Sequence, residues 1–186
     1  MNICAITAAL VAMSVPCLAQ GSRTSFSVMR EYVAADQVAL HVPIPDNVHA
    51  DDSYRALLGS MLERSPTFRR QCQRLASNPR VSVRFKPPAA AWARGARGLT
   101  HFVREAKGGL DAEITLARGE DEVELIAHEI EHVIEQLDGI DLSSLAGLRG
   151  TGVHQTLYAG DAFETTRAER MGLRVAREFR DARKGD

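Results

Sequence analysis

The sequence predicts an α+β fold that consists of a short antiparallel sheet, a helix with the motif HExxH, and a C-terminal helix. The strand signal comes from residues 80–85, where apolar and polar side chains alternate, and from residues 99–105 and 110–116, which flank the turn signal Lys107-Gly108-Gly109. The helix signal comes from two later stretches in which apolar residues recur at steps of three and four. The 186 residues suffice for one domain with a hydrophobic core.

The N-terminus is expected to be a signal peptide that covers residues 1–19. An apolar run at residues 3–15 precedes Pro16 and the small-residue site Cys17-Leu18-Ala19, which is typical of an export signal and its cleavage site. The run is too short to span a bilayer, and no later segment approaches the ~18 to 20 apolar residues of a membrane helix. We therefore expect a secreted or periplasmic protein with no membrane span in the mature chain. A buried N-terminal helix or a retained membrane anchor is the alternative for residues 1–19.

The mature chain is expected to begin with an N-terminal extended segment, residues 20–50, and to continue as one domain over residues 51–186. Pro43 and Pro45 stiffen the end of the extended segment. The formal net charge is −1. A chain this close to neutral has no field of one sign that would favour nucleic acid as a partner.

The cysteines predict a domain without an internal disulfide. Cys4 and Cys17 lie in the expected signal peptide, so Cys72 is the single thiol of the mature chain. Cys72 lies within a helical pattern, which favours a buried packing role over a role as a nucleophile.

Two helices are expected before the sheet. The first starts at Asp51-Asp52-Ser53, and the second starts at Ser65-Pro66, because serine can cap the free amides of a helix and proline fits its first turn. Apolar residues at helical spacing supply their inner faces, and these are Tyr54, Leu57, Leu58, Met61 and Leu62 in the first helix and Phe68, Cys72 and Leu75 in the second.

The helix with the motif is expected to follow Gly119-Glu120-Asp121 and to end near Leu137, with Gly139 at its stop. The motif itself is His128-Glu129-Ile130-Glu131-His132. Two histidines four residues apart project from one face of a helix, so both imidazoles can bind one metal ion. They flank an apolar stripe that should face the core, formed by Val123, Ala127, Ile130, Ile134 and Leu137.

This arrangement predicts one Zn²⁺ per chain. Neutral imidazoles bind zinc at ~2.0 to 2.1 Å, and a catalytic site usually has three protein ligands and leaves the fourth position to water. Glu129 would take a proton from that water, whose pKa zinc lowers, and would later pass the proton to a leaving amine.

The third ligand is expected to be Glu164. The last helix is predicted over residues 161–183, with Asp161 as its cap and Glu164 one turn before Ala168. The inward stripe of this helix contains Ala168, Met171, Val175 and Phe179, and the arginines from Arg167 onward occupy its solvated side. A carboxylate at the head of the stripe needs a partner, and zinc is one such partner. The alternatives for Glu164 are an ion pair with an arginine or a contact with the helix dipole.

Other candidates for the third ligand are Asp138 and His154, where His154 follows Gly150-Thr151-Gly152-Val153 in an expected loop. His154 and Tyr158 are also candidates for the donor that stabilises a developing oxyanion.

With these residues the chain resembles the gluzincin branch of the zincin metallopeptidases, in which HExxH on one helix is followed by a glutamate ligand on a later helix. The resemblance implies that His128, His132 and Glu164 bind zinc and that Glu129 is the general base. It also implies an upper edge strand that pairs with an extended peptide, and residues 112–117 are the matching segment. The chain departs from familiar gluzincins at Arg167 and Ala168, which replace the usual small and acidic residues after the glutamate.

The function expected from the sequence is an exported zinc metallopeptidase, an endopeptidase that acts on peptide or protein substrates. A non-catalytic, zinc-stabilised peptide-binding module of the same fold is the alternative, and a metal-free structural protein is a third reading. Glu129 favours the peptidase, because a structural zinc site prefers four protein ligands and does not require a base.

Overall fold

The computed structural model describes residues 43–87, 97–106, 108–117, 119, 121–156 and 162–184. All of them belong to one compact unit, Leu40–Asp186. The expected signal peptide and most of the expected extended segment lie outside the described residues. Among the described helices, none combines the length and apolarity needed to cross a membrane.

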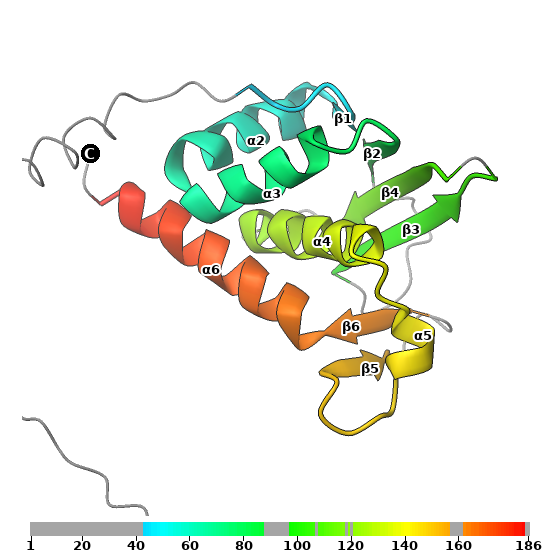
Figure 1. Ribbon diagram of the computed structural model, residues 1–186. Coiled ribbons are helices and arrows are strands. Elements are labelled where there is room, and N and C mark those ends of the chain that lie inside the picture. Colours follow the sequence, from blue (N-terminus) through cyan, green and yellow to red (C-terminus); the bar gives the residue numbers. More distant parts are fainter. Residues whose placement is uncertain are drawn as a thin grey trace, which may run out of the picture. The chain divides into compact units, whose positions relative to one another are not determined.

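Four strands form the main sheet in the order β1-β2-β4-β3 (Figure 1). They are β1 (Val48–His49), β2 (Val81–Lys86), β3 (Gly98–Arg104) and β4 (Leu110–Leu116). β3 and β4 form the predicted antiparallel hairpin, with Thr100 opposite Ile114. β1 and β4, however, both run parallel to β2.

The sheet is therefore mixed, and the expectation of an antiparallel sheet was wrong for β1 and β2. The hairpin inserts its second strand, β4, beside β2, which makes β2 and β4 parallel and leaves β3 at the edge. Alternation of apolar residues predicts a strand but not its direction. The mixed helix and strand content agrees with the predicted α+β class.

Two helices precede and two longer helices follow the main part of the sheet. They are α2 (Asp52–Arg64), α3 (Pro66–Ala76), α4 (Glu122–Leu137) and α6 (Thr166–Ala182), with a short α5 (Leu142–Leu145) between the last two. The predicted starts of α2 and α3 are confirmed. Asp51 Oδ1 accepts a hydrogen bond from the Tyr54 amide at 3.0 Å, and Ser65 Oγ accepts one from the Phe68 amide at 3.0 Å.

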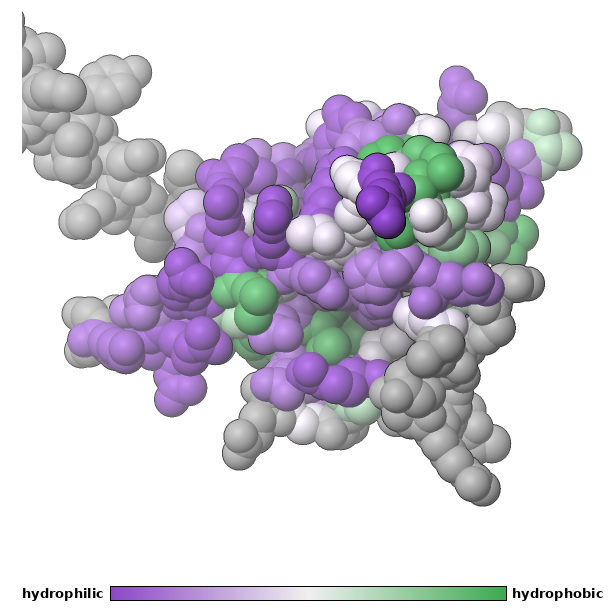
Figure 2. All heavy atoms as spheres, turned by 90° about the horizontal axis from the view of Figure 1, so that it is seen from below, coloured by the Kyte–Doolittle hydropathy of each residue, from purple (hydrophilic) through white to green (hydrophobic). Residues whose placement is uncertain are grey.

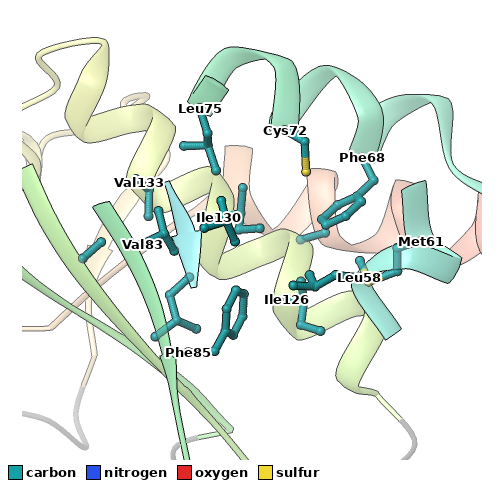
Figure 3. Packing of buried hydrophobic residues seen from close by; sticks show 14 of the residues in the cluster. Leu58, Met61, Phe68, Cys72, Leu75, Val83, Phe85, Ile126, Ile130 and Val133 are labelled. Carbon is teal, nitrogen blue, oxygen red and sulfur yellow. The ribbon is translucent and has the colours of Figure 1, made fainter. Parts of the chain in front are cut away.

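Helix α4 lies in the middle of the domain, between the sheet and α6 (Figure 1). Its apolar side chains meet those of α2, α3 and β2 in one core (Figure 3), where Ile126, Ile130 and Val133 pack with Leu58, Met61, Phe68, Leu75, Val83 and Phe85. Cys72 also points into this core and is 3% exposed. Burial raises the pKa of its thiol to about 12, so the predicted packing role of Cys72 is confirmed.

The last helix begins at Thr166, five residues later than expected. Phe163–Thr165 form β6, which pairs antiparallel with β5 (Val153–Gln155), a segment that the sequence predicted to be a loop. Thr165 caps α6, since its Oγ1 accepts a hydrogen bond from the Ala168 amide at 2.9 Å. Backbone pairing with β5 thus takes the residues before the cap out of the helix. Asp161, the expected cap, lies outside the described residues.

The buried face of α6 consists of smaller residues than predicted. Ala168 and Val175 are buried as expected, but Gly172 and Ala176 replace Met171 and Phe179 as their fully buried neighbours. Small residues allow α6 to approach α4 closely: a Cβ on Gly172 would lie 2.8 Å from the Glu124 carbonyl oxygen and 3.2 Å from His128 Cβ. Gly172 therefore sets the distance between α6 and the helix that carries the motif.

The surface is mostly hydrophilic in the view from below, and the hydrophobic residues visible there form separate patches (Figure 2). The outer side of α6 contributes exposed arginines, as predicted for Arg170, Arg174 and Arg177. Arg167 is an exception, because it is half-buried and binds two carboxylates, Glu131 and Asp138.

Replacing Gly172 by alanine is expected to destabilise the domain by about 1–3 kcal/mol, because the added methyl group would overlap the α4 backbone. Gly59 of α2 is the matched control, since nothing lies within 4 Å of a Cβ at that position. Gly59→Ala should stabilise the domain by about 0.5–1 kcal/mol through helix propensity. Urea denaturation measures both changes; effects of the same sign would contradict the close crossing of α4 and α6.

Candidate metal centre

Three side chains from two elements converge at one point. His128 and His132 come from α4, and their Nε2 atoms lie 3.1 Å apart. Glu164 comes from β6, and its Oε2 lies 2.9 Å from His128 Nε2 and 3.8 Å from His132 Nε2. Among the described residues, these three form a group close enough to hold a metal ion.

Glu164 was predicted correctly as a neighbour of the histidines, but in the wrong element. It occupies the middle of β6, opposite His154 of β5, and not the first turn of a helix. β6 leads directly into α6 through the cap at Thr165. The residue before that cap, Glu164, consequently lies beside His128 and His132 of α4.

The donor set fits a tetrahedral zinc site. Bonds of ~2.0 to 2.1 Å place the ligand atoms of such a site roughly 3.3 Å from one another. The three separations observed here, from 2.9 to 3.8 Å, bracket that distance. Two imidazole nitrogens and one carboxylate oxygen are also a set found in catalytic zinc sites.

The charges around the three donors favour a cation between them. Burial lowers the pKa of His132, but hydrogen bonds to Glu135 and Glu164 outweigh it and raise the pKa to about 10. Burial raises the pKa of Glu164, but hydrogen bonds from His128 and His132 outweigh it and lower the pKa to about 2. The surrounding carboxylates therefore stabilise a positive charge at this point.

Glu129, the candidate base, is held by the edge of the sheet. Thr100 Oγ1 donates a hydrogen bond to Glu129 Oε2 at 2.6 Å. On the other side of the carboxylate, a Cβ at Gly98 would overlap Glu129 Oε1, so glycine makes room for it. Burial raises the pKa of Glu129, while His132, His128 and the Thr100 hydroxyl each lower it. Glu129 is 3% exposed.

Glu135 forms a second set of contacts behind the histidines. Its Oε2 lies 2.8 Å from His132 Nδ1, and its Oε1 accepts a hydrogen bond from Thr165 Oγ1 at 2.7 Å. Sequence reasoning missed Glu135, although its position three residues after His132 puts both on one side of the helix. It also missed Thr100 and Gly98, for which no signal exists, because the register between a strand and a helix is a tertiary property.

The three donors lie in a cleft of about 930 Å³. Its lining includes β3 from Gly98 to Phe102 on one side, His128, Glu129 and His132 of α4, and residues of α5, β6 and α6. Residues 112–117 were expected to form the upper edge of this cleft, and that expectation was wrong. β4 lies between β2 and β3, so β3 is the strand at the edge.

Two further candidates lie apart from the three donors. Asp138 binds Arg74 and Arg167 at 2.8 Å each and is not a ligand candidate in this arrangement. His154 is opposite Glu164 in the β5–β6 pair, but its side chain is 55% exposed and its Nε2 lies 3.9 Å from Glu169 Oε1. Tyr158 lies outside the described residues.

No protein-family model, curated protein or solved structure matches this chain.

Thr100→Val is expected to raise the pKa of Glu129 in the metal-free protein, because the hydroxyl bonds the ionised carboxylate. It should also lower the free energy of unfolding by about 1–3 kcal/mol, since a buried acceptor loses its donor. Carbon-13 NMR of the glutamate carboxyl groups and urea denaturation measure the two effects. Thr100→Ser keeps the hydroxyl and should leave both near their wild-type values. Equal behaviour of the valine and serine variants would contradict a role for this hydrogen bond.

Proposed function

We propose that this protein is an exported zinc-dependent metallopeptidase in which Glu129 is the general base for hydrolysis of a peptide bond. The observation that carries the proposal is the convergence of His128, His132 and Glu164 in a cleft, with the buried carboxylate of Glu129 beside them. The resemblance to the gluzincins covers roughly residues 110–175, and it is specific at the HExxH motif.

Zinc would be held by His128, His132 and Glu164. When bound, it supplies a Lewis acid that acidifies a water molecule and polarises a carbonyl oxygen. A group of three protein ligands favours catalysis over a structural role, because structural zinc sites are usually closed by four protein ligands. The side chains of His128 and Glu164 keep 13% and 32% exposure, which leaves the centre accessible from the cleft.

The role of Glu129 is to hold and move a proton. Its carboxylate accepts a proton from the attacking water and delivers it to the leaving nitrogen. Burial raises its pKa, and this makes it a stronger base than an exposed glutamate, while the two histidines and the Thr100 hydroxyl act in the opposite direction. Thr100 and Gly98 limit its orientation.

Strand β3 is the proposed binding edge for the substrate. The Arg97 carbonyl accepts a hydrogen bond from the Ala117 amide, and the Glu105 amide donates one to the Gly109 carbonyl, at 2.8 and 3.0 Å. Residues of odd number on β3 therefore direct their peptide groups to β4, and Gly98, Thr100 and Phe102 direct theirs outward. An extended peptide that pairs with these residues would pass directly beside Glu129.

Export is proposed from the sequence of residues 1–19. His154 is proposed as the donor to the developing oxyanion, because β5 carries it opposite Glu164.

Glu129→Gln is expected to keep about one zinc per chain and to lower the rate of peptide hydrolysis by roughly 10²- to 10⁴-fold, because it removes the proton acceptor but no ligand. Zinc content is measured by elemental analysis and hydrolysis with a library of fluorogenic peptides. Glu122→Gln, in the first turn of the same helix, is the control and should retain both properties.

Two outcomes would contradict the proposal. A wild-type protein without zinc would remove its basis. A wild-type protein that holds zinc and binds peptides but cleaves none, with binding unchanged in Glu129→Gln, would support the non-catalytic peptide-binding module instead.

A further inference from the structure

We infer that Glu135 is a positioning residue that holds two of the three proposed zinc ligands, His132 and Glu164, in one fixed arrangement. The inference rests on the metal site of the proposed function and extends it to a residue outside the HExxH motif. Glu135 is 1% exposed and lies at the interface of α4 with the start of α6.

The first contact of Glu135 orients His132. A carboxylate only accepts hydrogen bonds, so the contact of 2.8 Å between Glu135 Oε2 and His132 Nδ1 places the proton of the ring on Nδ1. In the neutral ring that binds a metal, the lone pair then resides on Nε2, which faces His128 Nε2 at 3.1 Å and Glu164 Oε2 at 3.8 Å. Glu135 thus selects the tautomer that can bind a metal and increases the basicity of its donor nitrogen.

The second contact fixes the backbone that carries Glu164. Thr165 follows Glu164 directly and is 3% exposed. Its hydroxyl donates to Glu135 Oε1 at 2.7 Å and accepts from the Ala168 amide at 2.9 Å. The hydroxyl therefore links α4 to the last residue of β6 and the first turn of α6. A displacement of Thr165 would displace Glu164 with it.

Attachment of α6 to α4 does not by itself require Glu135. One turn earlier on α4, Glu131 already binds this part of α6: its Oε1 accepts from Arg167 Nε at 2.7 Å, and its Oε2 accepts from Gln71 Nε2 at 2.7 Å. Glu131 contacts neither His132 nor Glu164 through these bonds. Both contacts of Glu135 instead involve a proposed ligand, His132, or the residue next to one, Thr165. A buried carboxylate destabilises a protein unless hydrogen bonds or opposite charges compensate it.

Glu135→Gln separates the two contacts. The amide oxygen of glutamine can accept from His132 Nδ1, but its amino group then faces the Thr165 hydroxyl as a donor. The hydroxyl would have to accept this bond and the bond from the Ala168 amide, and it could no longer donate to residue 135. We therefore expect the zinc dissociation constant to rise by about 10- to 100-fold.

The matched control is Glu178→Gln. Glu178 lies on α6 and, like Glu135, accepts hydrogen bonds from other elements: from Ser65 Oγ at 2.6 Å and from the Thr67 amide and hydroxyl at 2.9 and 2.7 Å. These bonds attach α6 to the start of α3 and not to the metal centre. The control should lower the melting temperature of the protein in the presence of a chelator and leave the zinc dissociation constant within about twofold of wild type.

The measurement is a competition titration of zinc against a chromophoric chelator, with wild type and both variants as full mature chains. Visible spectra of the cobalt-loaded proteins give a second measure that does not depend on activity. The d–d bands should shift in Glu135→Gln, because the position and donor strength of His132 change, and should remain at their wild-type positions in Glu178→Gln.

Thr165 provides an independent pair of variants in case Glu135→Gln does not fold. Thr165→Ser keeps the hydroxyl and should bind zinc with wild-type affinity. Thr165→Val removes the hydroxyl and should weaken zinc binding. Equal zinc affinities of these two variants would overturn the proposed link to Glu164.

The remaining outcomes are distinct. Wild type that binds zinc, together with a Glu135→Gln variant of equal affinity and spectrum, overturns the inference and leaves the proposed function standing. The inference is also overturned if Glu178→Gln loses as much affinity, because a general loss of stability then explains both. Wild type that binds no zinc overturns the proposed function and this inference together.

Discussion

Helix α4 carries four ionisable side chains in places that water scarcely reaches, and the rest of the domain supplies their partners. Glu129, Glu131, His132 and Glu135 are at most 5% exposed. Each would be strongly destabilising without a hydrogen bond or an opposite charge. The hydrogen-bond partner of Glu129 lies on β3, and the partners of Glu131 lie on α3 and α6. The partners of Glu135 and His132 lie on β6, which ends at the cap of α6. The elements around α4 thus supply polar partners to these four side chains as well as apolar contacts to its other face.

The sequence was most informative where the signal is local. Caps at Asp51 and Ser65 and the periodicity of α4 depend on neighbours within a few residues, and all three are confirmed. The pair of histidines is likewise a property of helical spacing. Glu164 was predicted from the apolar stripe of the last helix, although the residue lies in β6.

Features that depend on pairing between distant segments were missed or predicted wrongly. The position of β4 between β2 and β3 decides which strand forms the edge of the cleft, and alternation within a strand carries no information on its neighbours. The contact of Thr100 with Glu129 needs the register of β3 against α4. The role of Gly172 depends on the crossing of α6 and α4 at Glu124, which is a contact between distant segments. The convergence of His128, His132 and Glu164 could thus be predicted from the sequence, whereas the residues that support them could not.

The central claim is that His128, His132 and Glu164 bind one zinc ion and leave room for water. Zinc K-edge X-ray absorption of the zinc-loaded protein tests it most directly. The account predicts one zinc per chain with nitrogen and oxygen ligands at ~2.0 to 2.1 Å, two of them imidazoles, and no sulfur. The spectrum of the zinc-loaded Glu164→Ala variant should show the loss of one oxygen ligand. A spectrum with sulfur or with three or more imidazoles, or one that Glu164→Ala leaves unchanged, would contradict the account.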